Sequence, residues 1–209
     1  MLPNRIKIYR IALLPFFCAG LLLSPNSQAL SFGESLDSML ERADLVFTGR
    51  LIEFRTYKVQ ETIYPYPNAP EKAYVVKSLY TDHVFEVEKV YKGEHNSRTV
   101  AITQLGGFND GSWSAPLGSY FLALGKTYTV IAVRSELNPD RLVTASYGLG
   151  VMEHVERDGQ TFLQNQGNGD FIEKPNDPRT WLSKSPLTLQ EFVSKVEQIK
   201  NQQGRDTHD

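Results

Sequence analysis

Cysteine and basic residues are the two most evident shortages in this sequence. Its 209 residues include a single cysteine, Cys18, which excludes a disulfide framework and a cysteine-based zinc site. The 22 lysines and arginines are outnumbered by 24 aspartates and glutamates, so the net charge is −2. Proteins that bind nucleic acids carry a surplus of basic side chains that neutralise phosphates. We therefore expect no nucleic-acid partner.

Long hydrophobic runs are also scarce, and the only one, Ile11–Leu23, lies close to the N-terminus. Basic residues precede it and the small residues Ser27 and Ala29 follow it, which is the order found in a secretory signal peptide. About 13 apolar residues are too few for a membrane-spanning helix, which needs about 20. We therefore predict that residues 1–29 are cleaved on export to the periplasm or the medium, with no membrane insertion afterwards. Loss of three basic residues would change the net charge from −2 to −5.

Sequence patterns typical of catalytic sites are absent as well. There is no Gly-x-Ser-x-Gly turn for a serine nucleophile and no glycine-rich phosphate loop. No two of the four histidines stand at metal-binding spacing, so we expect them at the surface or at strand edges. We predict no catalytic residue, no metal and no cofactor, and hence no enzyme. A site assembled from distant strands would leave no such pattern.

Two short segments have the apolar spacing of helices. Residues 36–43 carry apolar side chains on one helical face, and Ser35 precedes them as an N-cap. Near the other end, Thr188 and Glu191 form a capping box at the start of an apolar stripe over residues 189–199. We therefore predict one short N-terminal helix and one C-terminal helix.

Between these helices the hydrophobic period changes to two, which is typical of strands. The pair Asp158-Gly159 separates two apolar runs and predicts a hairpin, because both central turn positions need positive φ. The expected strands cover residues 45–54, 83–91, 98–105, 120–124, 128–133, 142–146, 150–156 and 160–163. The expected interior side chains are Leu45, Phe47, Leu51, Phe85, Val87, Val100, Ile102, Phe121 and Ile131.

Four motifs occur in an order that resembles a group of bacterial exported domains. They are Ala43–Leu51, similar to SDLV-x-x-G-x-V; Phe85–Gly93, similar to F-x-V-x-x-V-x-K-G; the pair Gly106-Gly107; and Leu117–Leu122. Those domains resemble the tissue inhibitor of metalloproteinases and netrin-like modules, which are OB-type barrels. The resemblance implies a mainly β fold, an OB-like antiparallel barrel, in a single domain over residues 30–200. Its C-terminal hairpin and helix would precede a disordered polar tail at 201–209.

The same resemblance raises the hypothesis of a protease inhibitor. In the eukaryotic inhibitors, a mature N-terminal cysteine chelates the zinc of the metalloprotease through its amino and carbonyl groups. Here the expected mature N-terminus is Leu30, and cleavage removes Cys18. The resemblance therefore implies the fold of that family without its cysteines or its inhibitory residues.

A segment rich in tyrosine and proline, residues 56–79, separates the first two expected strands. Three prolines within six residues exclude a regular central strand, so we expect an exposed loop or an extended arm. Its tyrosines would either pack onto the barrel as a cover or form a partner-binding surface, because tyrosine offers large contact area at low entropic cost. They are Tyr57, Tyr64, Tyr66 and Tyr74.

A second aromatic group lies in or next to residues 106–111, which we expect to be a loop from their glycine, asparagine and aspartate content. Phe108 lies within this loop and Trp113 follows it. Trp113 could stack on a sugar ring, dock against a partner side chain, or fold over the end of the barrel.

These observations predict an exported, non-enzymatic binding module whose rim loops bind a protein partner, with a peptidase as one candidate. The candidate binding residues are Tyr57, Tyr64, Tyr66, Tyr74, Phe108 and Trp113. Two alternatives stay open, namely a metalloprotease inhibitor-like protein and a hydrolase or metal-dependent enzyme whose residues meet only in three dimensions.

Overall fold

The computed structural model describes residues 34–63, 70–116, 119–165 and 187–206. The chain divides into two compact units, Met1–Ser31 and Phe32–Asp209, and all described residues belong to the second. The predicted signal peptide, Tyr64 and Tyr66 lie outside the described residues. The described elements are α2 (Leu36–Arg42), β1 (Leu45–Ile63), η1 (Pro70–Lys72), β2 (Tyr74–Lys92), β3 (Thr99–Leu105), β4 (Gly107–Asn109), β5 (Ser112–Ser114), β6 (Thr127–Arg134), β7 (Leu142–Thr144), η2 (Tyr147–Gly150), β8 (Val151–Arg157), β9 (Gln160–Asn165), β10 (Leu187–Thr188) and α3 (Leu189–Asp206).

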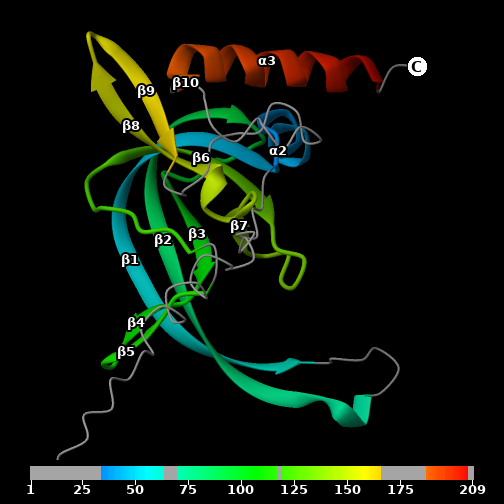
Figure 1. Ribbon diagram of the computed structural model, residues 1–209. Coiled ribbons are helices and arrows are strands. Elements are labelled where there is room, and N and C mark those ends of the chain that lie inside the picture. The colour runs from blue at the N-terminus through cyan, green and yellow to red at the C-terminus, as the bar shows by residue number, and fades with distance from the viewer. Residues whose placement is uncertain (1–33, 64–69, 117–118, 166–186, 207–209) are drawn as a thin grey trace, which may run out of the picture. The chain divides into compact units, whose positions relative to one another are not determined.

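The described chain is mainly β, with a short N-terminal helix and a C-terminal helix, as predicted (Figure 1). One large sheet has the strand order β1-β2-β3-β7-β6-β8-β9-β10. In addition β1 pairs with β6, from Leu45↔Ala132 to Arg50↔Thr127. The hydrogen-bonding path through β1, β2, β3, β7 and β6 therefore returns to β1. The β3–β7 pairing is parallel and consists of Ile102↔Leu142.

The long paired strands β1 and β2 are interrupted by three register shifts. They fall between Val46 and Phe47, between Thr48 and Gly49, and between Leu51 and Glu53. Such bulges increase the local twist and allow a strand to curve. Gly49 has no Cβ, and a Cβ there would lie 2.8 Å from the Glu86 carbonyl oxygen. Glycine at this position therefore permits the close approach of β1 and β2.

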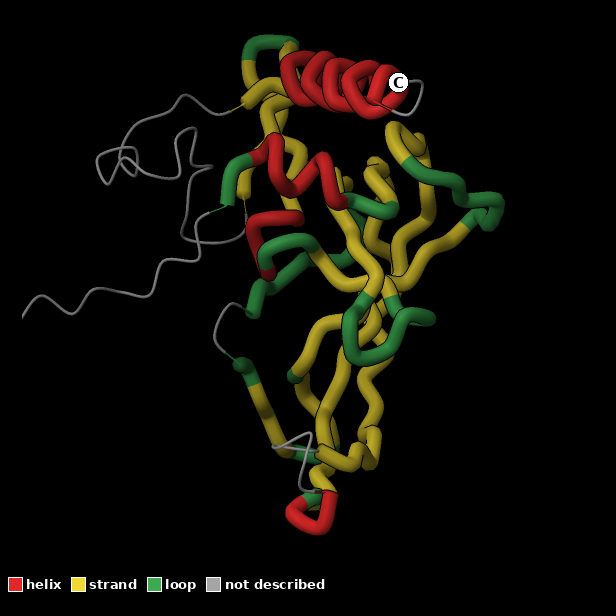
Figure 2. The backbone as a smooth tube through the Cα atoms, turned by 90° about the vertical axis from the view of Figure 1, so that its right-hand side faces the viewer, coloured by secondary structure: helices red, strands yellow, loops and turns green. Residues whose placement is uncertain are grey.

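Two hydrophobic clusters hold the described residues together. The interior cluster contains six of the predicted side chains, and Val87 packs against it; the six are Leu45, Phe47, Leu51, Phe85, Val100 and Ile102. The second cluster lies between the strands and the helices α2 and α3, which Figure 2 shows together at one end of the strands. Ile131 belongs to this second cluster, so its predicted interior position is wrong. Strand β6 is buried on both faces, and the sequence period cannot tell which face is the interior.

The predicted strand at residues 120–124 is also wrong, and Phe121 is exposed instead of interior. Leu51 of β1 bonds to the turn that follows residues 120–124. The Gly125 amide donates to the Leu51 carbonyl, and the Leu51 amide donates to the Lys126 carbonyl. In the segment itself, the Tyr120 amide donates to Gln104 Oε1 and the Ala123 amide donates to the Tyr128 hydroxyl. Side chains therefore replace the strand partner that a hairpin would have supplied.

Local turn and cap signals predicted from the sequence are confirmed. Asp158 and Gly159 have φ of 51° and 75° and join β8 to β9. The Ser38 amide donates to Ser35 Oγ at 3.1 Å, which caps α2. Helix α3 continues to Asp206, however, so residues 201–206 are helical where a disordered tail was expected. The described residues include no helix that is long and apolar enough to cross a membrane.

The segment 56–79 forms an extended arm rather than a loop where it is described. Strands β1 and β2 stay paired as far as Ile63↔Tyr74, and Figure 1 shows this part leaving the remainder of the sheet. The loop expected at residues 106–111 is wrong in part, because residues 107–109 form β4, which pairs with β5 in a small hairpin. Its turn residues Asp110 and Gly111 have φ of 49° and 75°, so Asp-Gly was a usable hairpin signal here as well.

The N-cap of α3 provides a stability test. Thr188 Oγ1 accepts from the Glu191 amide at 3.1 Å, and Glu191 accepts from the Thr188 amide at 2.8 Å. Loss of a capping hydroxyl typically costs about 1 kcal/mol. Thr188→Ala should lower the free energy of unfolding by about that amount in urea titrations. Ser194→Ala removes a mid-helix hydroxyl that bonds the Gln190 carbonyl and serves as the control, with little change expected.

Candidate functional site

Three exposed aromatic rings gather at the β4–β5 hairpin, and we call Phe108, Trp113 and Phe121 the aromatic surface. Phe108 and Trp113 are directly opposite one another in the hairpin. The Trp113 ring stacks on Phe121 with centroids 6.4 Å apart and planes 9° from parallel. Their exposed fractions are 64%, 63% and 67%. Trp113 is therefore largely exposed, which does not fit the option that it folds over the end of the barrel as a cover.

Glycine and threonine hold this hairpin against β1 and β2. The Gly106 amide donates to the Leu79 carbonyl at 2.6 Å, and Thr81 Oγ1 donates to the Gly106 carbonyl at 2.8 Å. Gly107 has φ of 135°, and a Cβ on it would lie 2.0 Å from Thr81 Oγ1. Only glycine fits that position. The backbone of Gly106-Gly107 thus sets where the aromatic surface lies.

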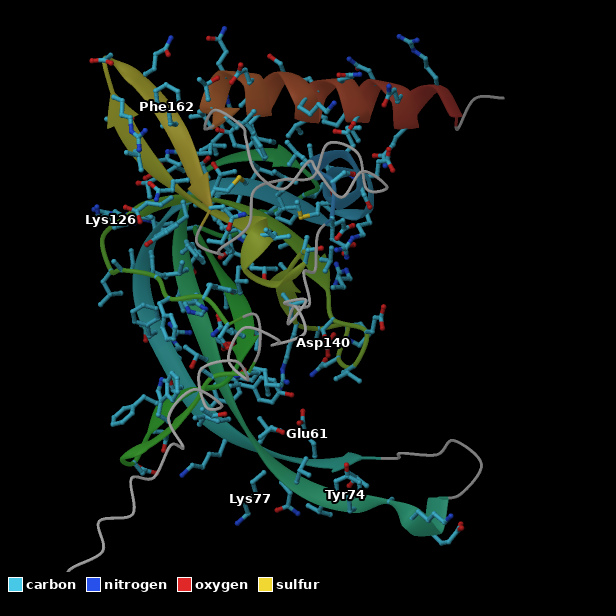
Figure 3. All side chains as sticks on the ribbon, in the orientation of Figure 1. Glu61, Tyr74, Lys77, Lys126, Asp140 and Phe162 are labelled. Carbon is cyan, nitrogen blue, oxygen red and sulfur yellow. The ribbon has the colours of Figure 1, made fainter. Side chains whose placement is uncertain are left out.

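The described arm tyrosines divide into one that serves the fold and one that is exposed. Tyr57 stacks on Tyr80 with centroids 6.2 Å apart, and its hydroxyl donates to Asp82 Oδ1 at 3.0 Å. The Tyr80 hydroxyl donates to Glu61 Oε1 at 2.7 Å. Burial raises the pKa of both phenols. Tyr74 is exposed on the arm (Figure 3).

Arg141 lies over this tyrosine pair. Its guanidinium carbon is 4.6 Å from the Tyr80 ring centroid and 6.0 Å from that of Tyr57. Its only ion pair among the described residues is a long one, 3.9 Å, to Glu61. Figure 3 shows Glu61 on the side of the arm that faces the loop of Asp140. Its side chain is only 22% exposed, so Arg141 is a largely buried cation held mainly by aromatic faces.

A cleft of about 730 Å³ opens beside Arg141, between β3 and β7. The two strands meet only at Ile102↔Leu142 and run in the same direction from that pair. Residues that follow it on both strands line the cleft, and we call this space the open seam. They are Thr103, Gln104 and Leu105 on β3 and Val143 and Thr144 on β7. The volume falls in the range of small-ligand sites.

Tyr120 and His83 form a buried pair at the inner side of the open seam. Their ring centroids are 5.2 Å apart, and Tyr120 lines the cleft. The Tyr120 hydroxyl lies near that of Thr144 but makes no hydrogen bond of normal geometry, and burial raises its pKa. His83 Nδ1 is buried without a partner, and burial lowers the pKa of this imidazole to about 4. The expectation of a surface or strand-edge histidine is therefore wrong for His83.

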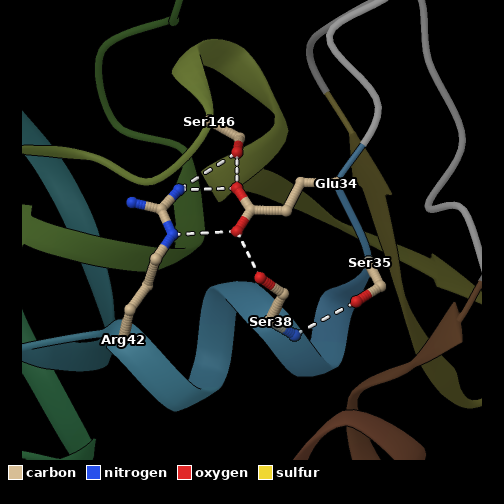
Figure 4. Close-up of polar contacts among 5 residues, drawn as sticks. All are labelled: Glu34, Ser35, Ser38, Arg42 and Ser146. Carbon is tan, nitrogen blue, oxygen red and sulfur yellow. Dashed lines mark hydrogen bonds and ion pairs between the residues drawn. The ribbon is translucent and has the colours of Figure 1, made fainter. Parts of the chain in front are cut away.

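The far rim of the seam is a polar network around Glu34 (Figure 4). Arg42 donates to the two carboxylate oxygens of Glu34 at 2.8 and 2.6 Å, and Ser38 donates at 2.6 Å. Ser146 Oγ also donates to this carboxylate, from a backbone with φ of 48°. The hydrogen bond from Arg42 lowers the pKa of Glu34. The network joins the start of α2 to the turn after β7.

Metal-ligating side chains do not cluster in the described part of the chain. No three His, Cys, Asp or Glu side chains there lie close enough to hold a metal ion. No protein-family model matches this sequence, and no curated protein matches it either.

Sequence reasoning identified Phe108 and Trp113 but missed Phe121, Tyr120 and Arg141. The apolar neighbours of Phe121 and Tyr120 predict a strand, and no motif surrounds Arg141. Only the folded chain brings Arg141 beside Tyr80, which is about 60 residues earlier in the sequence.

The buried His83 gives a pH-dependent stability. Its pKa is about 4 in the folded chain and 6.5 when exposed, so the unfolded state binds a proton first as the pH falls. Stability present above pH 6.5 should be lost between 6.5 and 4, by up to about 3 kcal/mol. His83→Leu should flatten this part of the curve of unfolding free energy against pH, measured in urea. Phe54→Leu, which disturbs the ring packed on His83 without removing a titrating group, should keep the slope.

Proposed function

We propose that this chain is an exported, non-enzymatic binding module that docks on a protein partner through the aromatic surface. The observation that carries the proposal is the group of three rings, each more than 60% exposed, presented on a hairpin. Folded proteins rarely leave adjacent large aromatic side chains in water unless another surface covers them. Tryptophan and tyrosine are also the side chains that most often dominate binding energy at protein interfaces.

The rigidity of the hairpin favours specific binding over non-specific hydrophobic association. Trp113 is held by its cross-strand neighbour Phe108 and by its stack on Phe121. A ring that is already ordered loses little entropy when a partner covers it. Lys58 forms an ion pair with Asp110 at 3.1 Å, which ties the hairpin tip to β1. Tyr74 and Val75, both exposed on the arm, offer a second apolar contact for the same partner.

The scaffold that supports this surface is, in our proposal, an OB-like barrel. The path β1-β2-β3-β7-β6-β1 has five strands, and its one parallel pairing lies between the third and the last of these strands along the chain. Five-stranded, partly open barrels of the OB type bind ligands with their rim loops. The β4–β5 hairpin and the arm are both connections between strands of this path. The scaffold is compatible with many partners and names none.

Export is the part of this proposal that N-terminal processing tests. If residues 1–29 are a signal peptide, the protein recovered from the periplasm or medium should begin at Leu30. Mass spectrometry of the recovered protein checks the mass and the first residue. Recovery of only the full-length chain in the cytoplasmic fraction would contradict export.

Affinity capture from periplasm or medium tests the aromatic surface. Trp113→Ala and Phe121→Ala should each weaken the captured interaction by about 2 kcal/mol, roughly thirtyfold, because a central aromatic contact is lost. Biolayer interferometry with the captured partner gives the affinity ratio. Both variants should keep the parent's unfolding midpoint within a few degrees, since the removed rings are exposed.

The matched control is Leu137→Ala, which removes an apolar side chain that is 88% exposed and lies outside the aromatic surface. It should bind the partner as tightly as the parent does. Equal affinities for the parent, Trp113→Ala and Phe121→Ala would show that the partner uses another surface.

A further inference from the structure

The arm begins where each of its two strands loses its second neighbour. Strand β1 pairs with β6 only as far as Arg50↔Thr127, and β2 pairs with β3 only as far as Tyr80↔Leu105. Beyond these pairs, no further strand among the described residues pairs with β1 or β2. A two-stranded ribbon is marginally stable at best when it stands alone. The direction of the arm therefore depends on the contacts made at its base.

A bulge in β1 lies just before the arm. Leu51 is the partner of Phe85 and Glu53 is the partner of Val84, so Ile52 has no partner on β2. A bulge bends a strand and increases its local twist. Figure 1 shows β1 and β2 turning away from the remainder of the sheet together. At this bulge the arm can change direction while the strand pairs on both sides of it stay intact.

The base of the arm is contacted on both of its faces. Tyr57↔Tyr80 and Thr56↔Thr81 are successive pairs, so their side chains point to opposite faces of the ribbon. On the threonine face, the two hydroxyls are 3.1 Å apart and Thr81 Oγ1 donates to the Gly106 carbonyl at 2.8 Å. The β4–β5 hairpin is therefore fastened to this face of the arm.

Arg141 covers the tyrosine face from the connection between β6 and β7. This connection is ordered by its own backbone, because the Ser135 amide donates to the Arg141 carbonyl and the Arg141 amide donates to the Asn138 carbonyl, each at 2.9 Å. The guanidinium carbon lies 4.6 Å from the Tyr80 ring centroid, whereas the ion pair to Glu61 is 3.9 Å long. The contact between the connection and the arm is therefore made mainly by a cation over aromatic rings.

We infer that Arg141 restrains a hinged arm. Its guanidinium over Tyr80 and Tyr57 holds the arm in the direction seen in Figure 1, and the bulge at Ile52 lets the arm swing when this contact is lost. Arg141 and Tyr80 also line the open seam, so movement of the arm changes one wall of that cleft. It also changes the separation of Tyr74 from the aromatic surface. The inference does not rest on the proposed function, because the arm's movement is measured without a partner.

Two spin labels measure the direction of the arm. Cys18→Ser removes the single native cysteine, and Thr62→Cys on the arm and Gln198→Cys on α3 introduce labels at two exposed positions. Double electron–electron resonance then gives the distribution of distances between the labels. We expect one narrow distribution for the parent and a distribution about twofold wider for Arg141→Gln, because the cation over the rings is lost.

Hydrogen exchange gives a second measurement that needs no label. Peptides that cover residues 74–79 of the arm should exchange about tenfold faster in Arg141→Gln than in the parent. Peptides that cover residues 128–133 of β6 should exchange at the parent's rate, because that strand is paired on both edges. The comparison separates release of the arm from a general loss of stability.

Two control variants remove a charge without removing the contact over the rings. Arg134→Gln is the matched control, because Arg134 also lines the open seam but is 65% exposed and pairs with Asp44 at 3.8 Å. Glu61→Gln removes the long ion pair and keeps an acceptor for the Tyr80 hydroxyl. Both variants should give the narrow distribution of the parent.

The inference is overturned if Arg141→Gln leaves the distance distribution and the exchange of residues 74–79 unchanged. Equal broadening in Arg141→Gln and Arg134→Gln would also overturn it. Broadening by Glu61→Gln as large as that by Arg141→Gln would assign the restraint to the ion pair instead of the rings. Thermal unfolding checks that each variant is folded, and Arg141→Met, which keeps the apolar stem, replaces Arg141→Gln if that variant is not.

Discussion

Burial of β6 on both faces is the constraint on which the described structure depends. Tyr128, Val130 and Ala132 point into the interior cluster, while Ile131 packs under the helices. One edge of β6 pairs with β1, and its other neighbours are β8 and then β7. With no disulfide to close the chain, this strand joins the two hydrophobic clusters through its alternating side chains. The interior and the helix layer therefore pack on opposite faces of the same strand, β6.

The β1–β6 and β3–β7 pairings differ greatly in length. Six residue pairs join β1 to β6, whereas a single pair joins β3 to β7. The short junction leaves strand edges unpaired and creates the open seam beside it. Buried polar groups then lie next to a cleft, because Tyr120 and His83 fill the space below it with aromatic rings. The cleft therefore arises from incomplete strand pairing.

The aromatic surface and the open seam differ in how they are built. The aromatic surface depends on local chemistry, since Asp110-Gly111 makes the turn and Gly107 permits the close approach to Thr81. The open seam depends on long-range contacts, since Tyr80, Arg141 and Tyr120 come from three separate segments.

The sequence by itself determined the mainly β class, the two helices, their caps, the Asp158-Gly159 hairpin and six interior side chains. These features follow from periodicity and from turn chemistry, which act over a few residues. It also identified Phe108 and Trp113 as aromatic residues beside a turn. It could not place Ile131, because an apolar residue in a strand of period two is compatible with either face, and it misplaced Phe121, because residues 120–124 do not form a strand. Only the tertiary structure decided that β6 is covered on both sides, that residues 120–124 bond to side chains, and that Arg141 reaches the Tyr57–Tyr80 pair. Those outcomes depend on contacts between residues far apart in the chain, and no local sequence pattern indicates which distant residues will meet.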